Sequence, residues 1–253
     1  MKKRIKLLAL AIMVSIVPAV ADDLAGWVEE NAGKAPDMVD GIKIYRPTET
    51  DGRQMISDFF DVPGTDKMTI MAKALAYCTD VLDKETEIIE TVEPASGRFV
   101  IGKMLTVGSG RNAVTYTYNI AFQSGDDVLS FACYDITVQY KEKGILSRTL
   151  TFEKLKPEEK EQHKEIVETF SIENSRFLND VLNFVKTGEC DPVTHWDEIE
   201  ACQVVKGMNM TEVKLSIGRP AHVTDQGNGR VKWMISNNFV VIFTDGIVTS
   251  VIR

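Results

Sequence analysis

The stretch from Lys206 to Arg253 constrains the fold more than any other part of this chain. Asn209, with Glu212 three residues later, is typical of a capping box that begins a helix. Gly218 stands where a helix C-cap needs a left-handed residue, and Pro220 prevents the helix from continuing. The sequence therefore predicts a short helix that starts at Asn209 and stops at Gly218.

Three short apolar runs follow this helix, at 231–235, 239–243 and 248–252. Asn237-Asn238 separates the first two runs, and Asp245-Gly246 separates the last two. Asp-Gly between apolar runs is a strong hairpin signal, because both residues tolerate positive φ. The C-terminal stretch is therefore predicted to end in a three-stranded antiparallel sheet.

The first 21 residues have the pattern of a secretory signal peptide. A basic start precedes an apolar run, Leu7 to Val17, and the small-residue cleavage site ends at Ala21. The run is shorter than the roughly 20 residues that span a bilayer. We expect an exported protein, periplasmic or extracellular. Because Asp22 and not cysteine follows the cleavage site, we expect no lipid anchor. Because no second apolar run of spanning length follows, we expect no transmembrane segment in the mature chain.

The mature chain is acidic. The signal peptide holds four basic residues and no acidic one, so its removal takes the formal net charge from −8 to −12. Such a surface repels phosphate backbones, and no stripe of lysine and arginine with interleaved aromatic residues offsets it. Nucleic acid is therefore not an expected partner.

The middle of the chain alternates helical and strand-like patterns. Residues 22–53 read as a polar leader with a short helix around 24–30, and a first strand is predicted at 54–61. After the turn at Pro63-Gly64, a helix with Thr65 or Asp66 as N-cap is predicted, with its buried face marked by Met71, Leu75, Cys78 and Leu82.

Five further strands are predicted between this helix and residue 152, and a long helix from 157 to 185 follows them. The strands are placed at 87–92, 98–107, 113–122, 128–140 and 146–152. In the third of them, Tyr116, Tyr118 and Ile120 alternate with polar residues, which indicates an antiparallel sheet with one buried face. One helix, a meander and then a long helix favour an α+β layer with helices on one face of the sheet.

All four cysteines lie in the exported part of the chain, where disulfides can form. The most local pairing joins Cys78 to Cys133 and Cys190 to Cys202. The alternative for the first pair is that Cys78 and Cys133 are small buried hydrophobic residues, since Cys78 falls on an apolar helix face and Cys133 within a strand.

The C-terminal residues resemble the SmpA/OmlA-like (BamE-like) envelope domain family. The resemblance rests on Lys206 to Val213, on Ile217-Gly218-Arg219-Pro220, on Trp233 and on the closing run Val241 to Val251. It implies a helix followed by a three-stranded sheet, and it says little about function. Members of the family include outer-membrane assembly lipoproteins, and the same architecture occurs in protein inhibitors of β-lactamases.

The preceding domain resembles a bacterial secreted domain of unknown function that has a TATA-binding-protein-like (TBP-like) fold. Val62 to Lys67 before the first helix and Gly97 to Lys103 in a following strand carry this resemblance. We thus predict a signal peptide at 1–21, the leader at 22–53, the TBP-like domain at 54–188, a linker at 189–194 and the BamE-like domain at 195–253. The fold class is α+β, with two small domains that each pack helices on one face of an antiparallel sheet.

No catalytic, cofactor or metal constellation is predicted. His163 lies in a Glu/Lys-rich helix start and is expected to be solvated, and His222 is expected at the surface. His195 lies between Cys190 and Cys202, but this spacing matches no usual zinc site.

The expected function is that of a non-enzymatic envelope module that binds another envelope or secreted protein. Its contact surface is predicted to include exposed aromatic residues, with Tyr116, Tyr118 and Trp233 as candidates. The alternatives are a protein inhibitor of a secreted hydrolase, and a hydrolase that uses the acidic residues from Asp197 to Glu200 on envelope polymers.

Overall fold

The computed structural model describes residues 37–50, 53–82, 87–142 and 146–253. The predicted signal peptide, the start of the leader and the short helix predicted around 24–30 lie outside these residues. The described residues all belong to one compact unit. None of the described helices is long and apolar enough to cross a membrane.

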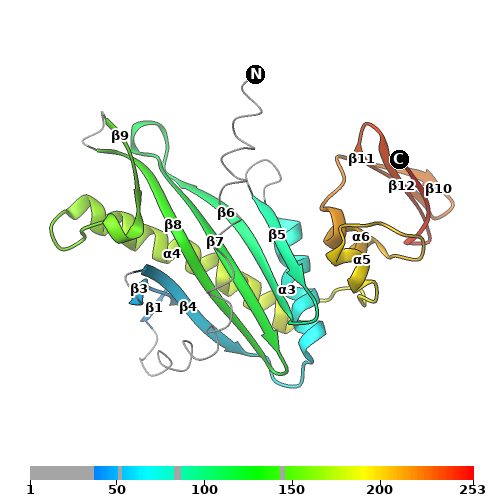
Figure 1. Ribbon diagram of the computed structural model, residues 1–253, viewed down its shortest axis with the longest axis horizontal. Helices are drawn as coiled ribbons and strands as arrows, with labels where there is room; N and C mark the ends of the chain where they lie inside the picture. Colours follow the sequence, from blue (N-terminus) through cyan, green and yellow to red (C-terminus); the bar gives the residue numbers. More distant parts are fainter. Residues whose placement is uncertain (1–36, 51–52, 83–86, 143–145) are drawn as a thin grey trace. The chain divides into compact units, whose positions relative to one another are not determined.

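The larger sheet has seven strands (Figure 1). Its order is β3-β4-β8-β7-β6-β5, and β9 also pairs with β8. All pairings are antiparallel, as the alternation at Tyr116, Tyr118 and Ile120 indicated. The bounds are β3 Thr48–Thr50, β4 Arg53–Asp61, β5 Ile88–Glu93, β6 Arg98–Val107, β7 Val114–Gly125, β8 Val128–Glu142 and β9 Leu146–Thr151.

Two helices, α3 (Lys67–Val81) and α4 (Glu161–Thr187), pack against each other and cover one face of this sheet (Figure 1). Asp66 is the N-cap of α3, where its side chain accepts from the backbone N–H groups of Met68 and Thr69. Phe170 of α4 is fully buried, with its ring centroid 4.9 Å from that of Tyr118 and 5.1 Å from that of Tyr116. The predicted helix-covered sheet is confirmed.

Part of the predicted leader joins this fold. Strands β1 (Asp37–Val39) and β2 (Ile42–Ile44) form a hairpin, and β3 pairs with β4. Tyr45 lies in the core with its ring centroid 5.0 Å from that of Phe131, and its N–H donates to Ser175 Oγ at 2.8 Å. The segment is polar overall, so its few apolar residues gave no recognisable period.

The prediction for His163 was wrong, because this side chain is buried. It was expected to be solvated, but only 3% of its surface is exposed. Its Nδ1 accepts the Lys156 N–H at 2.9 Å, and its Nε2 lies 2.8 Å from Tyr140 Oη. The first turn of α4 is charged on its other sides, so the sequence pattern did not reveal that one position faces the sheet.

The C-terminal segment has two short helices, α5 (Trp196–Glu200) and α6 (Met210–Ile217), and a four-stranded antiparallel sheet of order β10-β11-β12-β13. The predicted three strands correspond to β11 (Arg230–Ser236), β12 (Phe239–Thr244) and β13 (Ile247–Ile252). The prediction missed β10 (His222–Gly227), because every residue of that strand is exposed and no apolar alternation marks it.

The predicted capping box is present at the start of α6. Glu212, only 1% exposed, accepts the N–H of Asn209 at 2.8 Å and also those of Thr194 at 2.6 Å and His195 at 3.0 Å. Burial alone raises the pKa of Glu212, but the N–H groups that donate to it outweigh burial and lower its pKa. One carboxylate therefore fastens the segment before α5 to the start of α6.

Candidate binding groove along strand β5

Strand β5 lies at one end of the larger sheet and pairs only with β6 among the described strands. An edge strand directs half of its backbone N–H and C=O groups away from its partner, where they are free to bond another chain. A bulge interrupts the pairing between Ile89 and Thr91, so that Glu90 has no partner residue on β6. The position of β5 thus makes it a potential docking edge.

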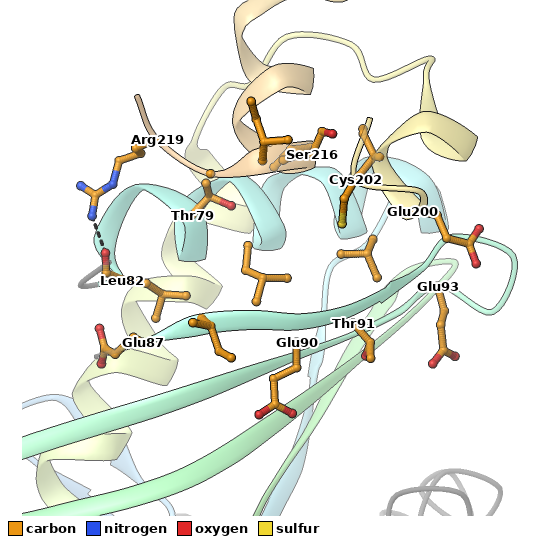
Figure 2. A pocket seen from close by; sticks show the side chains of 17 residues that line it. Thr79, Leu82, Glu87, Glu90, Thr91, Glu93, Glu200, Cys202, Ser216 and Arg219 are labelled. Atoms are coloured by element: carbon orange, nitrogen blue, oxygen red, sulfur yellow. Dashed lines mark hydrogen bonds between the residues drawn. The ribbon is translucent and has the colours of Figure 1, made fainter. Parts of the chain in front are cut away.

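A groove of about 790 Å³ runs along β5 (Figure 2). Its other walls are the last turn of α3, the end of α5 with Cys202 after it, and the end of α6 with Gly218 and Arg219. The volume lies within the range of natural small-ligand pockets. Ile88 and Thr91 of β5, which also line the groove, are exposed to solvent.

The wall opposite β5 is fixed by contacts between α3 and α6. Lys214 of α6 forms an ion pair with Asp80 of α3, with an Nζ to Oδ1 distance of 2.9 Å. Arg219 donates from its guanidinium to the carbonyl oxygen of Leu82 (Figure 2). Gly218 allows the chain to turn from α6 toward Arg219, since its φ of +76° is one that glycine adopts without strain.

The two faces of β5 differ in chemistry. Ile89 and Val92 lie opposite Ile101 and Phe99 of β6, both buried, and so belong to the face that α3 and α4 cover. Together with Ile199, Leu215 and Ile217 they give the groove an apolar floor. Figure 2 shows Glu90 and Glu93 projecting from the other side of β5, away from α3.

Four glutamate side chains line the groove, and two of them form ion pairs with basic side chains of this protein. Glu87 lies 2.6 Å from Lys103 Nζ, and Glu93 lies 3.0 Å from Arg98 Nη1. Within the part of the chain that the structure describes, Glu90 and Glu200 have no ion-pair partner. The groove therefore carries an excess of negative charge.

Glu90 is the more constrained of these two carboxylates. A Cβ added at Gly102 would lie 3.0 Å from Glu90 Oε1, so the carboxylate rests directly over this glycine of β6. Burial raises the pKa of Glu90, and the negative charge of Asp135 raises it further. A nearby positive charge would stabilise the ionised carboxylate and so oppose this rise in the pKa of Glu90.

The cysteines are free thiols in the structure. Cys78 and Cys133 are fully buried in the core of the larger sheet, and burial raises the pKa of Cys133 to about 12. Asn174 Nδ2 lies 3.3 Å from Cys133 Sγ. This burial agrees with the alternative that the sequence left open for Cys78 and Cys133. Cys202 is exposed at the groove, and Cys190 is half-buried elsewhere.

No three metal-ligand side chains gather anywhere among the described residues. His195 Nδ1 lies 3.0 Å from Glu212 Oε1, and so the histidine is drawn toward the capping box. His222 is exposed at the start of β10, as predicted. Of the acidic residues on α5, Asp197 and Glu200 are exposed, and Glu200 lines the groove.

The aromatic residues expected on the contact surface are not there. Tyr116 and Tyr118 point into the helix-covered core, at 0% and 1% exposure, and Trp233 packs on Phe243 with ring centroids 4.6 Å apart. The sequence placed Tyr116 and Tyr118 correctly on one face of a strand, but that face is the one that α4 buries. Trp233 is buried within the C-terminal segment. The predicted contact surface at these aromatic residues is therefore wrong.

Comparison with solved structures shows the TBP-like fold. A TBP-like protein from Parabacteroides distasonis matches with a TM-score of 0.50 and 14% identity over 56% of this chain and 98% of that chain. A DUF4468 family protein from Bacteroides ovatus matches with a TM-score of 0.42 and 16% identity, over 59% of this chain and 93% of that chain. Comparison with protein-family models and with curated sequences finds no match. The likeness concerns the fold, and the BamE-like resemblance of the C-terminal segment stays a prediction.

Proposed function

We propose that this chain is an exported, non-enzymatic module of the cell envelope that binds another protein through the groove at β5. The observation that carries the proposal is an edge strand lying open in a groove of about 790 Å³ that has an apolar floor. The signal-peptide pattern and the BamE-like resemblance support the envelope address, and the TBP-like fold supplies the scaffold.

The chemistry of the groove suits a polypeptide. Open sheet edges bind chains through main-chain hydrogen bonds, while pockets beside the edge select side chains. Ile89 and Val92 supply such a pocket, and Glu90 and Glu200 supply charge. The bulge and the charged residues at β5 also hinder two copies of this chain from pairing edge to edge, which is how natural edges avoid aggregation.

Site-specific crosslinking in the native envelope tests this function. A photoreactive residue at Val92, inside the groove, is compared with one at Thr249, an exposed position on β13. We expect a saturable protein adduct from position 92 that is absent from position 249. Equal adducts from both positions, or none from position 92, would overturn the proposal. Fractionation of the same cells tests the address, because an exported chain is recovered outside the cytoplasm and starts at Asp22.

A further inference from the structure

The two faces of β5 differ in a way that can select among polypeptides. One face is apolar and the other is acidic, and both adjoin the same unpaired edge of the strand. Ile89 and Val92 face α3, while the carboxylate of Glu90 lies on the opposite face over Gly102. Side chains of a strand alternate between the two faces of a sheet. A strand added at this edge would therefore place successive side chains against apolar and acidic surroundings in turn.

We infer that the groove takes an extended segment that adds to β5 as a further strand, with apolar side chains toward Ile89 and Val92 and lysine or arginine side chains toward Glu90. This inference rests on the proposed function and specifies the partner's chemistry. The occupant is a partner segment that alternates apolar and basic residues over the length of β5, which has six residues.

Charge complementarity supports a basic occupant. Glu90 and Glu200 lack ion-pair partners among the described residues, and Arg219, the cation in the groove lining, already donates to the Leu82 carbonyl. Glu90 is half-buried, where a charge pair is screened less by salt than at an open surface. An acidic segment would meet repulsion from the carboxylates of Glu90 and Glu200.

Three synthetic peptides test the inference against the full-length protein by fluorescence anisotropy. The first alternates valine or threonine with lysine and matches β5 in length, the second carries glutamate in place of lysine, and the third is the lysine peptide with alternate backbone nitrogens methylated. We expect the lysine peptide to bind about tenfold more tightly than the glutamate peptide, a difference of about 1.4 kcal/mol. We expect methylation to abolish binding, because it removes the N–H donors of one strand edge.

Protein variants locate the site. Glu90→Gln should weaken binding of the lysine peptide several-fold, whereas Glu158→Gln, which makes the same charge change at an exposed position of the chain, should leave it unchanged. Equal binding of the lysine and glutamate peptides, full binding of the methylated peptide, or no effect of Glu90→Gln would each overturn the inference. So would no binding of the lysine peptide at about 1 mM.

Failure of this inference can be told apart from failure of the proposed function. An adduct at position 92 together with no peptide binding means that a protein occupies the groove by another mode. No adduct at position 92 removes the proposed function itself, whatever the peptides do.

Discussion

Tyr140 Oη and His163 Nε2 lie 2.8 Å apart in a buried contact between β8 and the first turn of α4. The Lys156 N–H donates to Nδ1 of the same ring, so Nδ1 is the acceptor and the neutral imidazole carries its proton on Nε2. His163 therefore donates to the tyrosine hydroxyl, and this arrangement requires an uncharged ring.

This contact predicts that stability falls in mildly acidic solution. Burial lowers the pKa of His163, and the positive charge of Lys160 lowers it further. The unfolded chain, with a histidine pKa of about 6.5, binds the proton first, so the stabilisation is present above pH ~6.5 and is lost as pH falls below it. The slope is at most about 1.4 kcal/mol per pH unit for one proton. Urea midpoints measured above and below that pH check it.

Two variants separate His163 from the other titrating groups. His163→Gln keeps an acceptor for the Lys156 N–H and should flatten the dependence on pH between neutral and mildly acidic solution. His222→Gln removes an exposed histidine and should preserve the dependence. An unchanged slope in His163→Gln would show that another group is responsible.

The second prediction concerns Glu212 at the capping box. The carboxylate of Glu212 accepts hydrogen bonds from three backbone N–H groups. In Glu212→Gln an NH₂ group replaces one carboxylate oxygen, and this group cannot accept from the N–H donors that it faces. Hydrogen bonds to charged groups contribute about 1.5–3 kcal/mol, so we expect a loss of about 2 kcal/mol in the free energy of unfolding. Chemical denaturation measures it, with exposed Asp197→Asn as the control that should change little. A loss below about 0.5 kcal/mol in Glu212→Gln would contradict the role given to the carboxylate.

The third prediction concerns the core under α4. Phe170 contacts the rings of Tyr116, Tyr118 and Phe152 and is fully buried. Phe170→Ala should cost about 3–5 kcal/mol, because it removes apolar contacts and leaves a cavity, and Phe170→Leu should cost less. Thermal unfolding reports both losses. Val223→Ala, at a side chain that is 60% exposed, should stay within about 0.5 kcal/mol of the parent protein.

The fourth prediction concerns thiol reactivity. Iodoacetamide under reducing conditions should label Cys202 in the folded protein and should label Cys78 and Cys133 only after unfolding, because both are buried and have raised pKa values. Peptide mass spectrometry identifies the labelled residues. Rapid labelling of Cys133 in the folded protein would contradict its placement.

Omitting the reductant tests the predicted pairing. If Cys190 and Cys202 form the disulfide expected from the sequence, neither residue is labelled until reductant is added. If both are labelled without it, that pairing is wrong.

The sequence by itself determined the local features. Asp66 and the pair Asn209 and Glu212 mark helix starts through side-chain contacts with backbone N–H groups two or three residues away. The alternation around Tyr116 to Phe122 identified a strand with one buried face, and Asp245-Gly246 identified a hairpin. These signals were sufficient because each of them depends only on residues close together in the chain.

The tertiary structure alone decided which of these surfaces remain open. Tyr116 and Trp233 are buried by elements distant in sequence, and His163 is buried although its neighbours are charged. The position of β5 at a sheet edge depends on the order of the strands within the sheet, and this order differs from their order along the chain. Glu90 and Glu200 line one groove although they are 110 positions apart in the numbering, because α5 packs against β5. Such packing follows from burial of side chains across the whole chain, and no local pattern records it.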